Sequence, residues 1–186
     1  PENIGKLKEN FYQRLAYDEI FSTFLVNSEI RKKIKRIKKT KKNFNIEKQN
    51  EIISKLKFSL KNDQNKTLSE INKDLCSENK MFRLLQGDVG SGKTIVSLLS
   101  AFNTINSGFQ VAVMAPTEIL ARQHFLLAKK LFPQNIKIEL LSGKSSYKDK
   151  KIILNKIFNN QIDIIFGTHA LFQKKVKFKK LGLIII

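Results

Sequence analysis

Apolar runs of strand length alternate with longer amphipathic segments from about residue 58 to the end of the chain. The apolar runs predict strands, and the amphipathic segments predict helices. The predicted strands are residues 81–86, 110–115, 136–141, 161–166 and 181–186, and the predicted helices are residues 63–75, 93–106, 118–131 and 147–159. Repeated strand–helix–strand units are typical of a parallel sheet covered by helices on both faces. The predicted fold class is therefore α/β, with ligands expected at the carboxyl ends of the strands.

The first 57 residues follow a different pattern. Residues 6–42 contain neither Gly nor Pro, and their apolar side chains recur at helical spacing. This spacing predicts one or two amphipathic helices, and the polar residues 43–50 are expected to end this arm. The sequence therefore predicts two domains, a helical and basic linker arm at residues 1–57 and a sheet-containing lobe at residues 58–186.

The balance of charge favours a polyanionic partner but leaves a simpler explanation open. The chain has 35 Lys and Arg against 16 Asp and Glu, a formal net charge of +19. Such an excess attracts polyanions, of which nucleic acid is the commonest, but heavy use of Lys, Asn and Ile, as in an AT-rich genome, gives the same excess. Nine of the twelve residues from Arg31 to Lys42 are basic. That run is either a solvated helix face or tether, or a contact to nucleic-acid phosphates.

Cysteine use and hydropathy bear on where the protein works. Cys76 is the only cysteine, so no disulfide can form within the chain, which suits a reducing cytosol. No apolar run reaches the roughly 20 residues that cross a bilayer. We therefore expect a cytoplasmic protein without a membrane partner. The start at Pro1 without Met and the end in the apolar residues 183–186 lead us to expect a piece of a longer polypeptide.

A phosphate-binding pattern, G-x-x-x-x-G-K-[ST], lies between a predicted strand and a predicted helix. Its glycines allow positive φ, so that backbone N–H groups can curl around phosphates. Lys93 would place a charge on the β- and γ-phosphates, and the Thr94 hydroxyl would bind Mg²⁺. The following helix points its positive end at the same anion. The residues predicted to bind a nucleoside triphosphate are Gly87, Asp88, Val89, Gly90, Ser91, Gly92, Lys93 and Thr94, with Lys93 and Thr94 also as catalytic residues.

Three further loops follow predicted strands, at residues 115–118, 141–146 and 167–171. Each is rich in small or hydroxylated residues, and each alone would be an ordinary turn or helix start. Because all three are expected at one edge of the sheet, together they would suit a sugar–phosphate backbone. Upstream, Gln64 offers the donor and the acceptor that the edge of adenine requires, although a surface glutamine is the simpler interpretation.

These segments, taken in order, resemble the motifs of superfamily-two DNA translocases. The resemblance rests on Phe58–Gln64, Arg83–Thr94, Met114–His124, Leu141–Gly143 and Gly167–Phe172, whose order and spacing agree with that family. The stretch Arg14–Glu19 is similar to the helix that joins the wedge domain of such bacterial helicases to their motor. The resemblance covers nearly the whole chain and implies a RecA-like first motor lobe.

By this resemblance, Gln64 reads adenine, and the loop from Gly87 to Thr94 holds ATP and Mg²⁺. The residues implied along the DNA backbone are Pro116, Thr117, Ser142, Gly143, Thr168 and His169. The family uses ATP to drive double-stranded DNA past a wedge, which remodels stalled forks and Holliday junctions in repair and recombination. The implied partners are therefore branched or double-stranded DNA and the rest of the same polypeptide.

Three other functions stay open from the sequence. A nucleotide-dependent DNA clamp would share these loops without separating strands, a transcription–repair coupling translocase has a similar motor, and a metabolic kinase shares the phosphate loop. The resemblance to DNA translocases implies an Asp-Glu pair directly after Ile186, with a second motor lobe and its arginine fingers further along. Since phosphoryl transfer needs those groups, residues 1–186 alone are expected to bind ATP weakly and to turn it over negligibly.

Overall fold

The computed structural model describes residues 2–143 and 146–186, with the backbone alone at residues 2–9, 34–36 and 147. Contacts divide the chain into two compact units, one of Pro1–Thr40 with Ser77–Leu84 and the other of Lys41–Cys76 with Leu85–Ile186. The predicted boundary between residues 57 and 58 refers to domains of a longer polypeptide and stays a prediction. Within the described residues, no helix is both long and apolar enough to span a bilayer.

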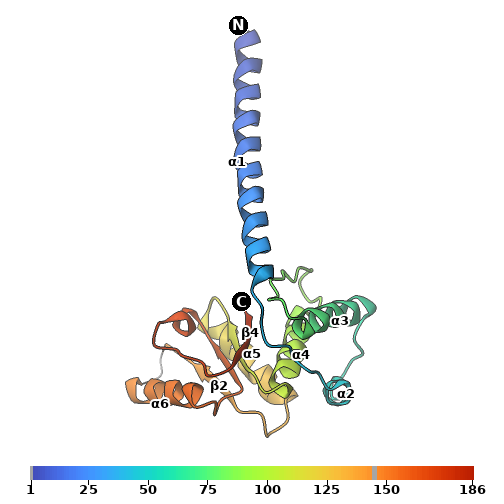
Figure 1. The fold of residues 1–186 in the computed structure, drawn as a ribbon, viewed down its shortest axis with the longest axis vertical. Coiled ribbons are helices and arrows are strands. Elements are labelled where there is room, and N and C mark those ends of the chain that lie inside the picture. The colour runs from blue at the N-terminus through green and yellow to red at the C-terminus, as the bar shows by residue number, and fades with distance from the viewer. Residues whose placement is uncertain (1, 144–145) are drawn as a thin grey trace. The chain divides into compact units, whose positions relative to one another are not determined.

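The first unit is built on α1, Glu2–Arg36, a single uninterrupted helix of 35 residues where the sequence predicted one or two (Figure 1). A short antiparallel bridge, Lys38 to Asn79, follows it within the same unit. The Lys39 N–H donates to the Glu78 carbonyl at 2.7 Å, and the Lys80 N–H donates to the Ile37 carbonyl at 3.2 Å. These bonds hold residues 77–80 beside the end of the helix.

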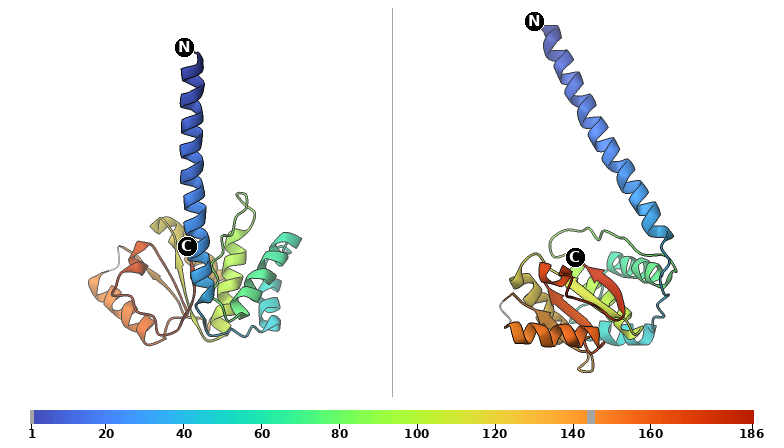
Figure 2. Two further views of the ribbon diagram at one scale, coloured as in Figure 1. Left: turned by 45° about the horizontal axis from the view of Figure 1, so that its top comes forward. Right: turned by 60° about the vertical axis from the view of Figure 1, so that its left-hand side comes forward.

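The second unit holds a parallel sheet and the helices that cover it. Its helices are α2 (Ile46–Ser54), α3 (Asn62–Cys76), α4 (Lys93–Asn106), α5 (Glu118–Leu131), α6 (Tyr147–Phe158) and the 3-10 helix η1 (His169–Phe172), and its strands are β1 (Gln110–Met114), β2 (Ile138–Leu141), β3 (Ile164–Gly167) and β4 (Leu181–Ile185). The strands run in the order β2-β3-β1-β4, and each neighbouring pair is parallel. Figure 2 (left) shows this sheet between the orange helix α6 and the green helix α4.

Neighbouring residues of β3 show that helices cover both faces of the sheet. Phe166 meets the Phe125 ring of α5 edge-on, with ring centroids 6.3 Å apart. Ile165 belongs to a buried cluster with Ile157 of α6. Because successive side chains of a strand point to opposite faces, α5 and α6 must lie on opposite sides. The predicted α/β class, a parallel sheet with helices on both faces, is confirmed.

The strand predicted at residues 81–86 is wrong, because no strand forms there among the described residues. Phe82 and Leu84, which would have faced a core, are 73% and 86% exposed. The physical reason is that a strand exists only through a paired neighbour, and residues 77–84 make their contacts with the first unit. The polar residues 43–50, which were expected to end the arm, contain the start of α2 at Ile46. Its signal was Asn45, whose side chain caps the helix by accepting from the Lys48 N–H at 3.2 Å.

Three amides join α2, α3 and α4. The Gln49 side-chain carbonyl accepts from the Asn72 amide at 2.9 Å and from the Asn103 amide at 2.6 Å. The Asn103 amide also donates to the Asn72 side-chain carbonyl at 3.0 Å. Asn103 is buried, and a buried amide is costly unless its hydrogen bonds are made. The cluster therefore fixes α2 and α3 on the helix that begins at the phosphate loop.

The side chain of Gln110 ties the sheet to the chain segments around it. Gln110 is 2% exposed. Its Nε2 group donates to the carbonyls of Ile157 and Ile162, each at 2.9 Å. Its Oε1 atom accepts from the backbone N–H groups of Lys179 and Lys180 at 3.0 and 3.1 Å. One amide thus holds the end of α6, the approach to β3 and the approach to β4 against β1.

We predict that Gln110→Leu lowers the free energy of unfolding by about 3 kcal/mol or more, because four backbone groups each lose a hydrogen bond in a largely buried place. The matched control is Gln161→Leu, at an exposed glutamine, which should change it by less than about 0.5 kcal/mol. Urea denaturation followed by circular dichroism measures both. An equal effect of the two substitutions would contradict the role given to Gln110.

Candidate nucleotide site and nucleic-acid interface

The phosphate loop has the backbone that its glycines predict. Gly90 and Gly92 have φ values of 79° and 86°, in the left-handed region. The Ser91 N–H donates to the Asp88 carbonyl at 3.2 Å, which closes a turn. Gly92 occupies the N-cap of α4, so the first turn of that helix has no side chain to cap it. The N–H groups of such a turn are available to an anion.

Lys93 turns back onto its own loop. Its ammonium group donates to the carbonyls of Gly87 and Asp88, each at 2.7 Å. Thr94 follows in the first turn of α4 and is half-buried. Among the described residues, no three His, Cys, Asp or Glu side chains gather into a metal site. The loop therefore offers a cation and a hydroxyl, and it supplies no cage of carboxylates for a metal.

Gln64 contacts the phosphate loop directly, which the sequence did not reveal. Its Oε1 atom accepts from the Lys61 N–H at 2.8 Å, and its Nε2 group donates to the Ser91 carbonyl at 2.8 Å. A Cβ atom added at Gly92 would overlap the Gln64 amide nitrogen. Only glycine therefore allows this approach. A second N–H and a second lone pair of the amide remain for another partner.

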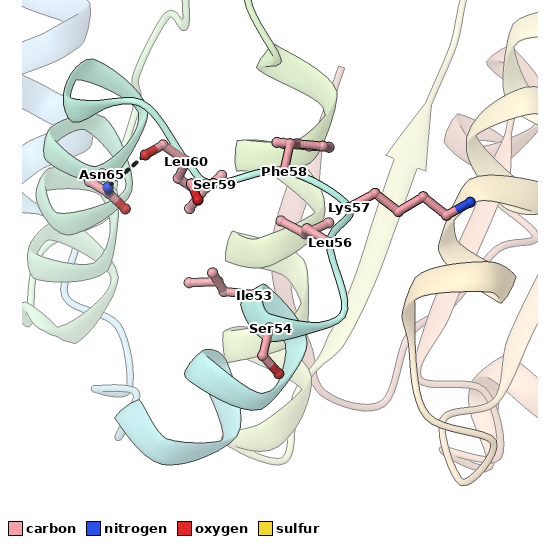
Figure 3. Close-up of a pocket in the computed structure, with 8 residues that line it drawn as sticks. All are labelled: Ile53, Ser54, Leu56, Lys57, Phe58, Ser59, Leu60 and Asn65. Carbon is pink, nitrogen blue, oxygen red and sulfur yellow. Dashed lines mark hydrogen bonds between the residues drawn. The ribbon is translucent and has the colours of Figure 1, made fainter.

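A pocket of about 530 Å³ opens between α2 and α3. Figure 3 shows its lining, which comes from the end of α2, the connecting segment and the start of α3. The lining residues are Ile53, Ser54, Leu56, Lys57, Phe58, Ser59, Leu60 and Asn65. The Asn65 amide donates to the Leu60 carbonyl at 3.2 Å and so fixes the turn. Phe58 is half exposed, so the pocket combines an aromatic surface with the turn that carries Gln64.

The three loops predicted at one edge of the sheet do lie there. Met114 and Leu141 both pair with Gly167, so β1, β2 and β3 end side by side. The Ala115 N–H then donates to the Gly167 carbonyl at 2.9 Å. A Cβ atom at Gly167 would lie 3.0 Å from the Leu141 carbonyl, so these loops are closely packed. Residues 144 and 145 of the second loop lie outside the described residues.

The candidate side chains of these loops differ in what they already do. Pro116, Thr117, Gly143 and His169 are exposed, and Ser142 and Thr168 are half-buried. The Thr117 hydroxyl caps α5 by accepting from the Leu120 N–H at 3.3 Å, whereas within the described residues the Thr168 hydroxyl makes no capping bond to η1. The Ser142 hydroxyl donates to the Glu118 carboxylate, a partner that the sequence did not predict.

Burial affects the charge of His124 on α5. The ring is partly buried, and burial lowers its pKa below the ordinary value. Burial therefore favours the neutral form of this ring.

A family model of DEAD/DEAH box helicases matches residues 61–186 of the chain. The chain belongs to that family. The match covers the phosphate loop, the whole sheet and all three loops at its carboxyl edge. The family model therefore includes the three loops that meet at the carboxyl edge of the sheet.

Individual relatives confirm the predicted resemblance to DNA translocases. The ATP-dependent DNA helicase RecG of Thermotoga maritima is 43% identical over 179 residues, 96% of this chain and 23% of the relative. RecG of Aquifex aeolicus is 41% identical over 184 residues, 98% of this chain and 23% of the relative. The chain thus spans about a quarter of the length of these relatives.

Solved helicase structures agree on the fold. A structure of RecG bound to a three-way DNA junction matches 92% of this chain and 24% of its own chain, with a TM-score of 0.84 and 43% identity. The UvsW helicase of bacteriophage T4 has a TM-score of 0.51 at 19% identity over 77% of this chain and 50% of its own, which supports the helicase-lobe fold alone.

We predict that Gly92→Ala lowers the affinity of the helicase lobe for nucleotide roughly tenfold more than Gly90→Ala does. Both substitutions strain a left-handed residue by about 1–2 kcal/mol. Only the one at Gly92 also displaces the Gln64 amide, since the space at Gly90 is open. Titration with a fluorescent ATP analogue measures the difference.

Gly108→Ala is the matched control, because Gly108 has φ 80° and open space but lies at the far end of α4. It should reduce stability and leave nucleotide affinity unchanged. Adding Gln64→Ala to Gly92→Ala should cost less affinity than the two single losses together, because Gly92→Ala already displaces the Gln64 amide. Equal losses at Gly90 and Gly92 would contradict the contact between Gln64 and the loop.

Proposed function

We propose that this chain is the first motor lobe of an ATP-dependent DNA helicase that remodels branched DNA in repair and recombination. The observation that carries the proposal is the meeting of three loops at the carboxyl edge of the sheet, where Gly167 pairs with both Met114 and Leu141. The likeness to RecG bound to a three-way junction, at 43% identity, supports the choice of substrate. The work would take place in the bacterial cytoplasm.

ATP and Mg²⁺ would occupy the loop from Gly87 to Thr94. The Lys93 ammonium is already held at this loop by two carbonyls at 2.7 Å. A phosphate oxygen carries more charge than a carbonyl, so the triphosphate would draw this ammonium away from them. The Thr94 hydroxyl and the phosphate oxygens suit Mg²⁺, which is usually bound by few protein ligands together with substrate phosphates. When bound, the ion would neutralise charge that develops during phosphoryl transfer.

Adenine would be read by Gln64 with the neighbouring pocket. The unused N–H and lone pair of the Gln64 amide provide the donor and acceptor that one edge of adenine needs. Phe58 lines the pocket that borders the same turn, and an aromatic face suits a planar base. Because Gln64 also donates to Ser91, base recognition and the phosphate loop would share one side chain.

DNA would lie across the carboxyl edge of the sheet. The residues proposed to follow its backbone are Pro116, Thr117, Ser142, Gly143, Thr168 and His169. Hydroxyl and backbone N–H groups are common donors to phosphate oxygens. Such contacts position a nucleic acid without reading its sequence, which suits an enzyme that must move along any sequence.

The rest of the same polypeptide is the proposed partner of α1. Large apolar side chains are exposed all around this helix, namely Phe11, Tyr12, Leu15, Tyr17, Ile20, Phe21, Phe24, Leu25, Val26 and Ile30. A helix that is apolar on every side is normally buried by its neighbours. Because the chain spans about a quarter of its relatives, the remaining domains, including a wedge and a second motor lobe, would provide that cover.

We predict that Lys93→Ala in the full-length protein lowers DNA-stimulated ATP hydrolysis by at least about a hundredfold, because a charge at the transferred phosphate is lost. Lys66→Ala, at an exposed lysine of α3, is the control and should leave the rate unchanged. Steady-state ATPase assays with and without a three-way junction measure both. Equal hydrolysis by the wild type with and without DNA would refute the motor and favour a clamp or another P-loop enzyme.

A second substitution tests the DNA face. Thr168→Val keeps the shape of the side chain and removes a hydroxyl that caps nothing within the described residues. Losing one phosphate hydrogen bond, worth about 1 kcal/mol, should weaken junction binding about fivefold. Fluorescence anisotropy with a labelled junction measures this, and Thr67→Val in α3 is the control. Unchanged affinity would remove Thr168 from the interface.

A further inference from the structure

Glu118 links two loops that do not follow neighbouring strands. It is the first residue of α5, directly after the loop that follows β1. Its Oε1 atom accepts the hydroxyl of Ser142, which follows β2. The strand order β2-β3-β1 places β3 between them. The side chain therefore reaches past the end of β3 and connects loops that backbone pairing cannot join.

The same carboxylate lies against the next residue of the turn. A Cβ atom at Gly143 would lie 3.6 Å from Glu118 Oε2, so the glycine backbone passes close to the second oxygen. The Lys150 ammonium also holds the turn, donating to the Gly143 carbonyl at 2.9 Å. The turn at residues 142–143 is thus clamped between the starts of two helices, α5 and α6.

The Glu118 carboxylate lies at the edge of the sheet where DNA is proposed to bind. The proposed ligand is a polyanion, and a negative charge near its phosphates lowers affinity. The positive end of α5 offsets part of that charge, because Glu118 lies in the first turn. A neutral side chain could cap the turn without repelling phosphates. A carboxylate is favoured here only if the turn needs a strong hydrogen-bond acceptor.

We propose that Glu118 is a positioning residue, which fixes the turn at Ser142 and Gly143 so that it meets the same DNA backbone as the loop at Pro116 and Thr117. Phosphate oxygens only accept hydrogen bonds, and the single proton of the Ser142 hydroxyl is donated to Glu118. The Ser142 hydroxyl therefore bonds to the carboxylate, and the backbone of the turn would bond to the phosphate. This inference rests on the proposed function.

The test uses the full-length protein and four variants, Glu118→Ala, Glu118→Gln, Ser142→Ala and the double alanine variant. Glutamine retains a carbonyl acceptor for the Ser142 hydroxyl, so it should preserve the link. We expect Glu118→Ala and Ser142→Ala each to weaken three-way junction binding roughly five- to tenfold. The double variant should lose no more than either single one, and Glu118→Gln should stay within about twofold of the wild type.

Two further readouts separate positioning from general damage. The junction concentration that half-stimulates the ATPase should rise in Glu118→Ala, while the rate at saturating DNA and the ATP affinity stay unchanged. The backbone amide chemical shifts of residues 142 and 143, measured by NMR without DNA, should change in Glu118→Ala and stay close to those of the wild type in Glu118→Gln. Glu47→Ala is the matched control, because Glu47 is an exposed acid in the first turn of α2.

Several outcomes would overturn the inference. Tighter junction binding in both Glu118 variants would show that the carboxylate only repels DNA. Equal loss in Glu118→Ala and Glu118→Gln, or additive loss in the double variant, would show that the hydroxyl acceptor is not what matters. Unchanged amide chemical shifts in Glu118→Ala would refute the link itself without touching the helicase proposal. No junction binding by the wild type would refute the proposed function, and the role of Glu118 in it.

Discussion

Met114, Gly167 and Leu141 end their strands side by side, and the chemistry of the lobe depends on that register. Parallel strands paired in register end at the same edge of the sheet, so the loops that follow them lie close together. Gly167 makes the meeting close, since a Cβ atom there would lie 3.0 Å from the Leu141 carbonyl. The register in turn is held at the other end of β1, where the Gln110 side chain binds the segments that lead into β3 and β4. A polar residue in the core thus helps to position the loops at the opposite edge.

Local signals in the sequence were enough wherever a helix carries its own boundary. The helices at residues 93–106 and 118–131 were predicted to the residue, because Gly92 and Thr117 stop the preceding chain and begin the helix. The strand at residues 81–86 could not be predicted in the same way. Its apolar pattern is real, but a strand depends on a distant partner, and those residues associate with the first unit instead. Periodicity reports what a segment can bury and does not report which surface it meets.

The candidate site likewise has features that depend on local sequence and features that depend on the fold. The phosphate-loop pattern specifies its residues through backbone requirements that are local, and the positive φ angles of Gly90 and Gly92 follow from them. The contact of Gln64 with Ser91 joins residues 27 apart in the chain, and the link between Glu118 and Ser142 joins residues 24 apart. No spacing rule could have predicted either one. Both became visible only once the fold placed donor and acceptor together.

Charge alone would have been a poor guide to the interface. The chain carries a net charge of +19, yet the edge proposed to meet DNA contains a carboxylate, and burial favours the neutral form of His124 on α5. Long-range attraction from many lysines acts over about 10 Å at moderate salt and gives no alignment. Alignment comes from short bonds to rigid donors, and a donor is rigid only when it is itself held. A motor that moves along DNA must bind each phosphate at a defined place and release it again. It therefore gains more from an acid that holds a turn in place than it loses in attraction.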